Sequence, residues 1–291
     1  MDLLQSKITL SSDVEVSIME PNMDNSPNPD RKRRTWRWIL IGFAIALTIT
    51  WLALTPSGLL GKAHAVGYAV CHQIEARSFH IHTRPFPLCA RCSGLFLGAL
   101  LGMIFQAVQG RKGKMPGIWA SVFFGLLGLA WVLDGVNSFA MLVPSLPSVY
   151  QTTNWTRLVT GTGMGLAVAA FLWPAFIQTM YRNWHDQSAL GGWQRIIGLV
   201  GLAALLVGLI LIEIAWVLYP LALLSAFSVI MLLTMVYSMA LVMLFKRDNT
   251  FERFSQLLIP LVGGYVLAML QIGAINLVRF LMTGTWSGFS L

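Results

Sequence analysis

Seven long apolar stretches constrain this chain more than any other feature of its sequence. About 20 largely apolar residues in a helix are needed to cross the roughly 30 Å hydrocarbon core of a bilayer. Only 11% of the 291 residues are charged, whereas a soluble domain usually carries about 25%. The sequence therefore predicts an all-α, polytopic transmembrane bundle of about seven spans. The expected spans run approximately over 38–55, 88–108, 118–138, 156–181, 195–219, 221–245 and 254–282.

The positions of the basic residues predict how this bundle is oriented. The connections after the second, fourth and sixth stretches contain Lys and Arg, whereas those near 138–154 and at Tyr219-Pro220 contain none. Because cytoplasmic loops are enriched in Lys and Arg, we expect the N-terminus inside and the C-terminus outside. The net charge of +8 is thus interpreted as a topology and membrane-surface signal, and not as a nucleic-acid contact. The basic connections hold Arg111, Lys112 and Lys114, then Arg182 and Arg195, then Lys246, Arg247 and Arg253.

The composition divides the chain into three expected parts. Residues 1–35 are polar and rich in acidic residues, which is typical of a disordered tail, here on the cytoplasmic side. Residues 36–182 form a four-span core, and residues 183–291 form a three-span C-terminal membrane region. The segment from Ser57 to Ile74 is apolar but too short to span. We expect it to lie at the interface or to re-enter without crossing.

The chemically capable residues gather in the first non-cytoplasmic connection. All three cysteines and four of the five histidines lie between His64 and Cys92. Cys89 and Cys92 follow Pro87, which fits a helix start, so the spacing places both sulfurs on one side of a first helical turn. The helix N-terminus and Arg91 favour the thiolate form, which binds metals and attacks disulfides.

Two further ligands are available to this Cys-x-x-Cys pair from the preceding loop. Cys71 and His72 lie there, and three cysteines with one histidine match a closed tetrahedral site for zinc or another transition metal. His80 or His82 could replace His72, because adjacent residues rarely bind one ion. The sequence predicts that Cys71, His72, Cys89 and Cys92 are the metal ligands.

Other interpretations of the cysteines stay open. Cysteine is common in apolar packing, and a structural disulfide suits an oxidising outer face. A membrane thiol–disulfide oxidoreductase that passes electrons to quinones has a similar layout, although three cysteines are one short of its usual two pairs. Lys62, Arg77, Arg84 and Arg91 are basic where the topology disfavours it. They indicate a bound anion or a fixed partner, unless this loop simply tolerates a few extra cations. In a transporter or lipid-handling protein, Arg77, Arg84 and Arg91 would hold an anionic headgroup.

Polar residues in the third and fourth stretches are expected at the same face. Asp134 and Arg157 lie at similar depth if these spans are antiparallel neighbours, which predicts an ion pair between them. Close packing of spans is predicted by Gly94, Gly98 and Gly102 in the second stretch and by Gly161 and Gly165 in the fourth. The residues expected to support the ligands or contact a substrate are Gln73, Arg77, His80, His82, Arg91, Asp134, Asn154 and Arg157.

Together these motifs resemble the domain of unknown function 2085 (DUF2085) family of prokaryotic membrane proteins. The resemblance covers about residues 60 to 175, and one position departs from it, since Ser93 stands where threonine is expected. It implies an integral protein of the prokaryotic cytoplasmic membrane and these shared motif residues, and it supplies no activity. It rests on Cys71-His72-Gln73, Arg77-Ser78, Pro87-Leu88-Cys89-Ala90-Arg91-Cys92-Ser93-Gly94, Gly98, Asp134-Gly135, Asn154, Arg157, Gly161 and Gly165.

Overall fold

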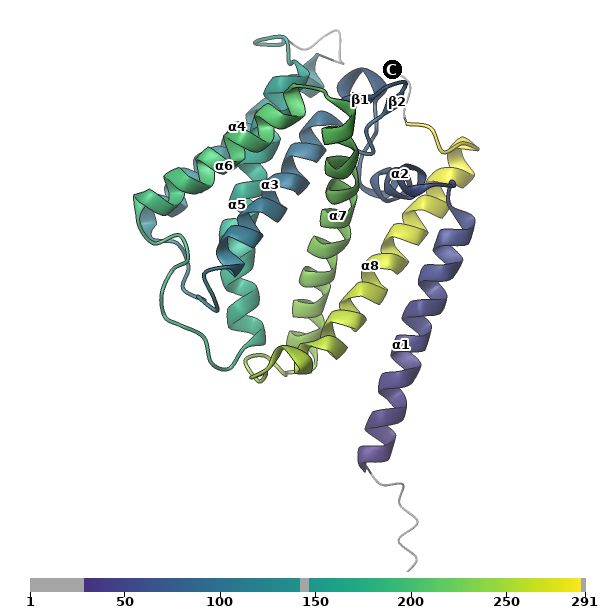
Figure 1. Cartoon of the computed structure of the whole chain (residues 1–291), viewed down its shortest axis with the longest axis vertical. Coiled ribbons are helices and arrows are strands. Elements are labelled where there is room, and N and C mark those ends of the chain that lie inside the picture. The colour runs from purple at the N-terminus through teal and green to yellow at the C-terminus, as the bar shows by residue number, and fades with distance from the viewer. Residues whose placement is uncertain (1–28, 142–146, 289–291) are drawn as a thin grey trace, which may run out of the picture.

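The computed structural model describes residues 29–141 and 147–288, and most of the expected N-terminal tail, residues 1–28, lies outside the described residues. The described chain is almost entirely helical, with one short hairpin (Figure 1). The elements in order are α1 (Pro29–Leu54), α2 (Leu59–Val70), the 3-10 turn η1 (Glu75–Arg77), β1 (His80–Ile81), β2 (Arg84–Pro85), α3 (Ala90–Ala107), α4 (Ile118–Ala140), α5 (Asn154–Met180), α6 (Trp193–Leu211), α7 (Ala215–Leu244) and α8 (Phe254–Thr283).

Seven of these helices are long and apolar enough to cross a membrane, which confirms the expected number of spans. They are α1 and α3 to α8. The other helix, α2, has 12 residues and is only about 18 Å long at 1.5 Å per residue. It packs against α7 and α8 near one end of the bundle (Figure 1). This placement agrees with the expectation that the segment from Ser57 to Ile74 does not span.

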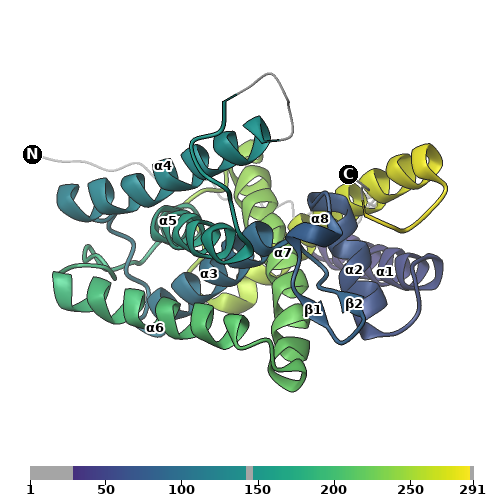
Figure 2. The ribbon, with the colours of Figure 1, turned by 90° about the horizontal axis from the view of Figure 1, so that it is seen from above.

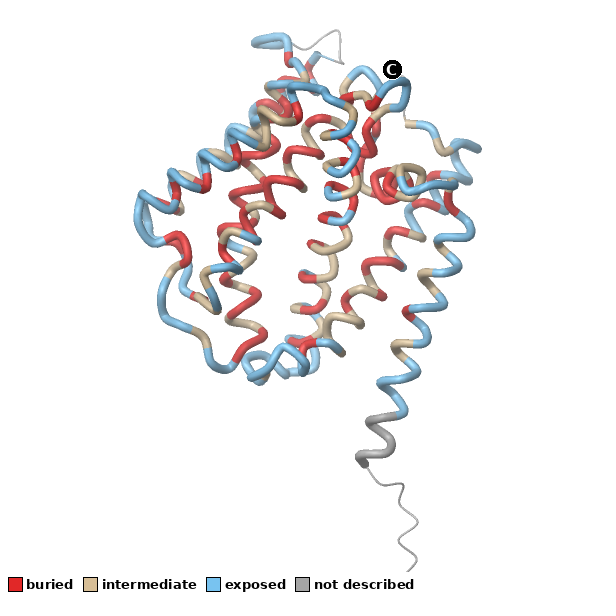
Figure 3. The backbone as a smooth tube through the Cα atoms, in the orientation of Figure 1, coloured by how far each residue is buried: buried red, intermediate tan, exposed pale blue. Residues whose placement is uncertain are grey.

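The most closely packed pair of helices is α3 and α5, which lies between α4 and α6 (Figure 2). The predicted glycine stripes make this pairing possible. A Cβ atom on Gly94 would lie 2.4 Å from the Leu158 carbonyl oxygen, and one on Gly165 would lie 2.2 Å from the Leu95 carbonyl oxygen. Any side chain at these positions would push the two backbones apart. Buried residues concentrate along α3 and α5, whereas α1 is exposed over most of its length (Figure 3).

The three basic connections lie together at one end of the bundle, as the charge pattern predicts. A backbone bridge joins Lys112 to His185, and another joins Tyr181 to Phe251. α2, the β hairpin and the segment after α8 lie at the opposite end, which we call the cysteine end (Figure 1). That the cysteine end faces outward stays a prediction from the charge pattern.

Two boundaries differ from the expected ones. Helix α1 begins at Pro29, about nine residues before the expected span at 38–55, because proline suits the first position of a helix. The break between α6 and α7 lies at 212–214 and not at Tyr219-Pro220. Pro220 is in the second turn of α7, where it removes only one helical hydrogen bond near the helix start. Glu213, with φ of 56°, forms the actual turn.

Candidate three-cysteine site

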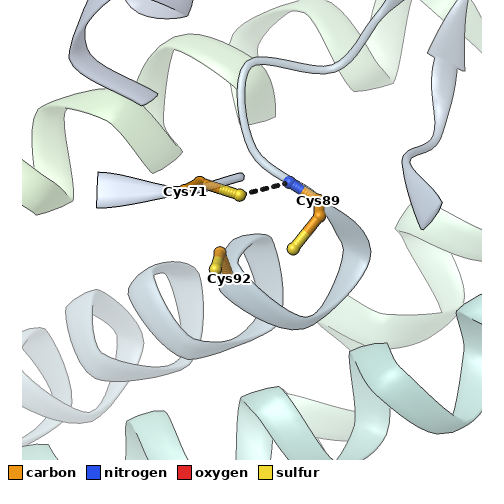
Figure 4. Close-up of side chains that lie close together, drawn as sticks. All are labelled: Cys71, Cys89 and Cys92. Carbon is orange, nitrogen blue, oxygen red and sulfur yellow. Dashed lines mark hydrogen bonds between the residues drawn. The ribbon is translucent and has the colours of Figure 1, made fainter. Parts of the chain in front are cut away.

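The three cysteines, which lie 18 and 3 residues apart in the sequence, meet at the cysteine end. The Sγ atoms of Cys71, Cys89 and Cys92 all lie within 4.8 Å of one another, and none of them is in a disulfide. Figure 4 shows Cys71 approaching from the loop after α2, while Cys89 lies just before α3 and Cys92 lies in its first turn. Among the described residues, this is the one group of three or more His, Cys, Asp or Glu side chains close enough to share an ion.

Helix ends place these sulfurs. Cys71 directly follows the last residue of α2, and its N–H donates to the Gly67 carbonyl oxygen at 2.8 Å. Cys89 directly precedes α3 in extended conformation, so the helix starts at Ala90 and not at Pro87 as expected. Gly67 is required here, because a Cβ atom on it would lie 1.9 Å from the Pro87 carbonyl oxygen. This close approach brings the end of α2 against the start of α3.

Two backbone N–H groups point at the sulfur of Cys71. The Cys89 nitrogen donates to Sγ at 3.3 Å (Figure 4) and the Gln73 nitrogen donates at 3.4 Å. Gln73 reaches this position with a φ of 52°, in the left-handed region. Hydrogen bonds from N–H groups favour a charged sulfur over a neutral one.

The thiols of these cysteines differ in their pKa values. Hydrogen bonding with the Cys71 and Cys92 sulfurs lowers the pKa of the Cys89 thiol well below its usual value. Hydrogen bonding to Cys89, with burial, raises the pKa of Cys71 to about 12. Cys89, at the N-terminus of α3, is therefore the thiol that loses its proton first.

The histidines predicted beside the cysteines lie outside this group. The side chain of His72 is exposed, and its carbonyl oxygen accepts a 3.2 Å hydrogen bond from Arg279 Nη2. His80 Nε2 lies 3.7 Å from Glu75 Oε1, and His82 is exposed in the hairpin turn with φ of 57°. The structure thus brings together three of the four predicted ligands.

Asp134 is the centre of a second buried cluster at this end of the bundle. Its carboxylate is 1% exposed and accepts hydrogen bonds from Arg91, at 3.1 Å from Nε to Oδ2 and also from Nη2. The Tyr150 hydroxyl donates to Oδ1 at 2.7 Å, and the Thr160 hydroxyl donates to Oδ2 at 3.3 Å. Arg91 therefore connects the Cys-x-x-Cys turn of α3 to α4.

The predicted ion pair between Asp134 and Arg157 is wrong. Arg157 Nη2 donates to the Thr152 hydroxyl at 2.6 Å and to the Ser138 hydroxyl at 3.5 Å, while Nη1 donates to Asn154 Oδ1 at 3.2 Å. The two side chains are at similar depth, as expected, but depth does not fix the direction in which a residue points around its helix. The charged partner of Asp134, Arg91, comes from α3 instead of α5.

Arg77, expected to support the site, is half-buried at the end of η1. Burial lowers the pKa of its guanidinium, and the nearby positive charge of Arg91 lowers it further. No salt bridge to Arg77 or Arg157 is present among the described residues. The cysteine end therefore carries more positive than negative side-chain charge around the sulfurs.

Arg279 of α8 is a part of this site whose role sequence reasoning missed. Its Nη1 donates to the carbonyl oxygens of Tyr68 and Cys71, at 2.7 Å each, and its guanidinium carbon lies 3.9 Å from the centre of the Tyr68 ring. These bonds satisfy carbonyl groups at the C-terminal end of α2. An arginine within an apolar span was a signal, but its partner lies 208 residues away in the sequence.

Similarity to known proteins agrees with this picture. A family model described as predicted membrane protein (DUF2085) matches residues 71–171. An uncharacterized protein, MJ1492, of Methanocaldococcus jannaschii is 30% identical over 122 residues, which cover 41% of this chain and 72% of that protein. An uncharacterized protein of Methanothermobacter thermautotrophicus is 28% identical over 101 residues, which cover 34% of this chain and 82% of that protein. No solved structure matches the chain.

The matched residues begin at Cys71 and end in α5, so they include the three cysteines, Asp134 and Arg157. The seven apolar helices and the family match lead to one conclusion. The chain is a multi-pass membrane protein that belongs to the DUF2085 family of predicted membrane proteins.

Proposed function

We propose that this membrane protein holds one transition-metal ion, of the zinc class, between Cys71, Cys89 and Cys92. The observation that carries the proposal is the convergence of three sulfurs within 4.8 Å of one another. A tetrahedral zinc site with Zn–S distances of about 2.3 Å has sulfurs roughly 3.8 Å apart. A disulfide instead needs two sulfurs at about 2.05 Å and has no use for a third.

The surroundings of the sulfurs suit thiolate ligands. The backbone N–H groups of Gln73 and Cys89 donate to Cys71 Sγ, as groups around metal ligands commonly do. Three thiolates around a divalent ion carry a net charge of −1. Arg77 and Arg157, which have no acidic partner among the described residues, supply compensating positive charge at the same end of the bundle.

The fourth coordination position decides what the metal does. His72 follows Cys71 directly and is the ligand that the sequence favours, although its side chain is exposed. If His72 turns inward on metal binding, the site is closed and structural. If a water or a substrate fills the position, the site is of the catalytic type.

The test is metal analysis with thiol counting on the purified full chain. We expect about one zinc or iron per chain in the wild type, and loss of it in Cys89→Ser. His185→Ala is the matched control, because His185 lies at the opposite end of the bundle. His72→Ala separates the two forms of the site: metal is lost if the site is closed and retained if it is open. Absence of metal, with two of the three thiols unreactive until reduced, would sink the proposal.

A second candidate function is thiol–disulfide exchange. The observation that favours it is the lowered pKa of Cys89 beside a second cysteine at a helix N-terminus. The Cys89 thiolate would attack a partner disulfide, which forms a mixed disulfide and releases one thiolate of the partner. Cys92 would then attack the mixed disulfide, which forms the Cys89–Cys92 disulfide and releases the partner in its reduced, dithiol form. Cys92→Ser would then accumulate a mixed disulfide with the partner, whereas the metal proposal predicts metal loss without one.

A further inference from the structure

A groove of about 1590 Å³ lies between the first half of α1 and the helices α7 and α8. Thr48 Oγ1 of α1 lies 2.8 Å from the Tyr265 hydroxyl oxygen of α8. From this contact the two helices diverge toward the end that holds the basic connections (Figure 1). The groove occupies the angle between them, within the membrane-spanning part of the chain. It is larger than the roughly 300–1,000 Å³ that is usual for small-molecule sites.

The polar and apolar residues of this groove are separated along its length. Toward the middle of the spans every described wall residue is apolar, as at Val242, Ile259 and Leu267. The polar wall residues lie where the first span begins, in the loop after α7 and in the first turn of α8. They are Arg37, Arg247, Thr250, Ser255 and Gln256. A molecule with a polar head and an apolar tail has the same division.

The length of the groove matches the depth of one leaflet. Ser255 and Leu267, at the two ends of the wall that α8 provides, are 12 positions apart in the sequence. This separation corresponds to about 18 Å at a rise of 1.5 Å per residue. The hydrocarbon core of a bilayer is about 30 Å thick, so one leaflet contributes about 15 Å. The groove therefore extends from the headgroup level to about the middle of the bilayer.

Two positive charges from different segments lie at the polar end. Neither the Arg37 nor the Arg247 side chain makes a hydrogen bond or ion pair within the described part of the chain. No acidic residue is among the wall residues that the structure describes. Asp248 and Glu252 lie in the same loop but outside the wall, and Glu252 Oε1 lies 3.9 Å from Arg182 Nη1. A tryptophan lies on each side of Arg37 in the sequence, which is typical of the headgroup level.

We propose that this groove binds one anionic phospholipid from the leaflet at this end of the bundle. An acyl chain lies along the apolar wall, and the phosphate pairs with Arg37 and Arg247, because guanidinium groups bind phosphate through parallel hydrogen bonds. A second copy of the chain fits the groove less well. Copies inserted in one orientation would bring their own basic connections to the two arginines. The groove does not include the cysteines, so this proposal and the proposed function can fail independently.

Native mass spectrometry of the purified full chain tests the preference for an anionic headgroup. The chain is mixed in detergent with phosphatidylglycerol and phosphatidylcholine that carry the same acyl chains. We expect one phosphatidylglycerol per chain and about 10-fold or more weaker retention of phosphatidylcholine, because its headgroup has no net charge. Equal retention of the two lipids, or retention of neither by a monomer or a dimer, would overturn the proposal.

The double variant Arg37→Gln/Arg247→Gln removes both charges from exposed positions. We expect its retention of phosphatidylglycerol to fall about 10-fold or more. The matched control is Lys114→Gln/Arg195→Gln, which also loses two exposed charges at this end of the bundle, but outside the groove. It should retain the lipid as the wild type does. An equal loss in the two variants would mean that net charge attracts the lipid, and would overturn the site.

The apolar half of the groove is tested by Leu40→Trp, because the larger side chain fills space that Leu40 lines. We expect this variant also to lose about 10-fold or more of the bound phosphatidylglycerol. Ile45→Trp, at a 55% exposed position of α1 outside the groove, should retain the lipid. Metal content, measured on the same samples, should equal that of the wild type in every variant. Full retention by Leu40→Trp would overturn the assignment of the lipid to this groove.

Discussion

The two ends of the bundle use the same kinds of residues in different ways. At the cysteine end, the ion pair of Arg91 and Asp134 has side chains that are 17% and 1% exposed. At the opposite end, the pair of Lys114 and Asp186 has side chains that are 57% and 74% exposed. Exposed pairs contribute little to stability, whereas a buried charge must keep its partner. The cysteine end is thus a built polar site, and the opposite end is a solvated surface.

The connections of the two ends differ in the same way. At the opposite end, backbone bridges such as the one between Tyr181 and Phe251 join the loops, and most of the basic side chains are exposed. Arg111 is the exception, because it is half-buried and donates to the Glu252 carbonyl oxygen at 2.8 Å. At the cysteine end, side chains such as Gln73, Asp134 and Arg279 make the bonds between segments far apart in the sequence. Most basic residues at the opposite end are therefore the charge signal from which the orientation was predicted, whereas those at the cysteine end hold a polar site in place.

The largest expected difference between the ends concerns the two ion pairs. Asp134→Asn leaves Arg91 charged and without its partner, and should lower the free energy of unfolding by about 3–5 kcal/mol. Asp186→Asn should change it by less than about 0.5 kcal/mol, because its pair is exposed. Unfolding in detergent, followed by tryptophan fluorescence, measures both. Similar losses in the two variants would remove the distinction between the ends.

Packing gives the next largest contrast. A Cβ atom on Gly161 would lie 2.2 Å from the Arg91 carbonyl oxygen, whereas nothing lies within 4 Å of one on Gly198 in α6. Gly161→Ala should therefore destabilise the protein by about 1–3 kcal/mol through overpacking. Gly198→Ala should be neutral or slightly stabilising, since alanine is the better helix former. Thermal unfolding of both variants provides the comparison, and a harmless Gly161→Ala would contradict the close α3–α5 packing.

Arg279 tests whether the last span holds the cysteine site in place. Arg279→Gln loses the hydrogen bonds to the carbonyl oxygens of Tyr68 and Cys71. We expect its affinity for the metal to fall about 10–100-fold, as is usual when a group that positions a ligand is removed. Competition with a zinc chelator measures this, with Arg247→Gln as the control. Unchanged affinity in Arg279→Gln would mean that Cys71 keeps its place without α8.

The smallest expected effect is a pH dependence at His64. Burial lowers the pKa of His64 from 6.5, so the unfolded chain takes up the proton before the folded chain does. Its contribution to stability is complete above pH 6.5 and is lost as the pH falls through the folded-state pKa.

Hydrogen exchange of residues 59–73, corrected for intrinsic rates, should therefore show less protection at about pH 5.5 than at about pH 7.5. His64→Gln, which has no ring to protonate, should show no such change. The same loss in the variant would show that another group is responsible.

The sequence predicted the parts of this molecule that depend on local pattern. Apolar length predicted all seven spans, and the glycine stripes of α3 and α5 predicted their close contact. The arrangement of Lys and Arg predicted which connections share an end. These features follow from the periodicity and composition of single segments, so they can be predicted without knowing how distant segments pack.

The sequence was a poorer guide to features that depend on where a side chain points around its helix, or on contacts between segments far apart in the chain. The cysteines were expected together, but Asp134 pairs with Arg91 because the angular position of a residue on its helix is set by packing. The partners of Arg279 and of Gln73 lie in other elements, and no spacing rule connects them. The turn at Glu213 was missed because Pro220 is a stronger turn signal by residue type.

X-ray absorption spectroscopy at the metal edge tests the central claim, that the three sulfurs form one metal site, most directly. The purified chain should show three sulfur neighbours at about 2.3 Å around one metal ion, and Cys71→Ser should reduce them to two or abolish the signal. A bound metal with only nitrogen and oxygen neighbours, or no bound metal at all, would contradict the account.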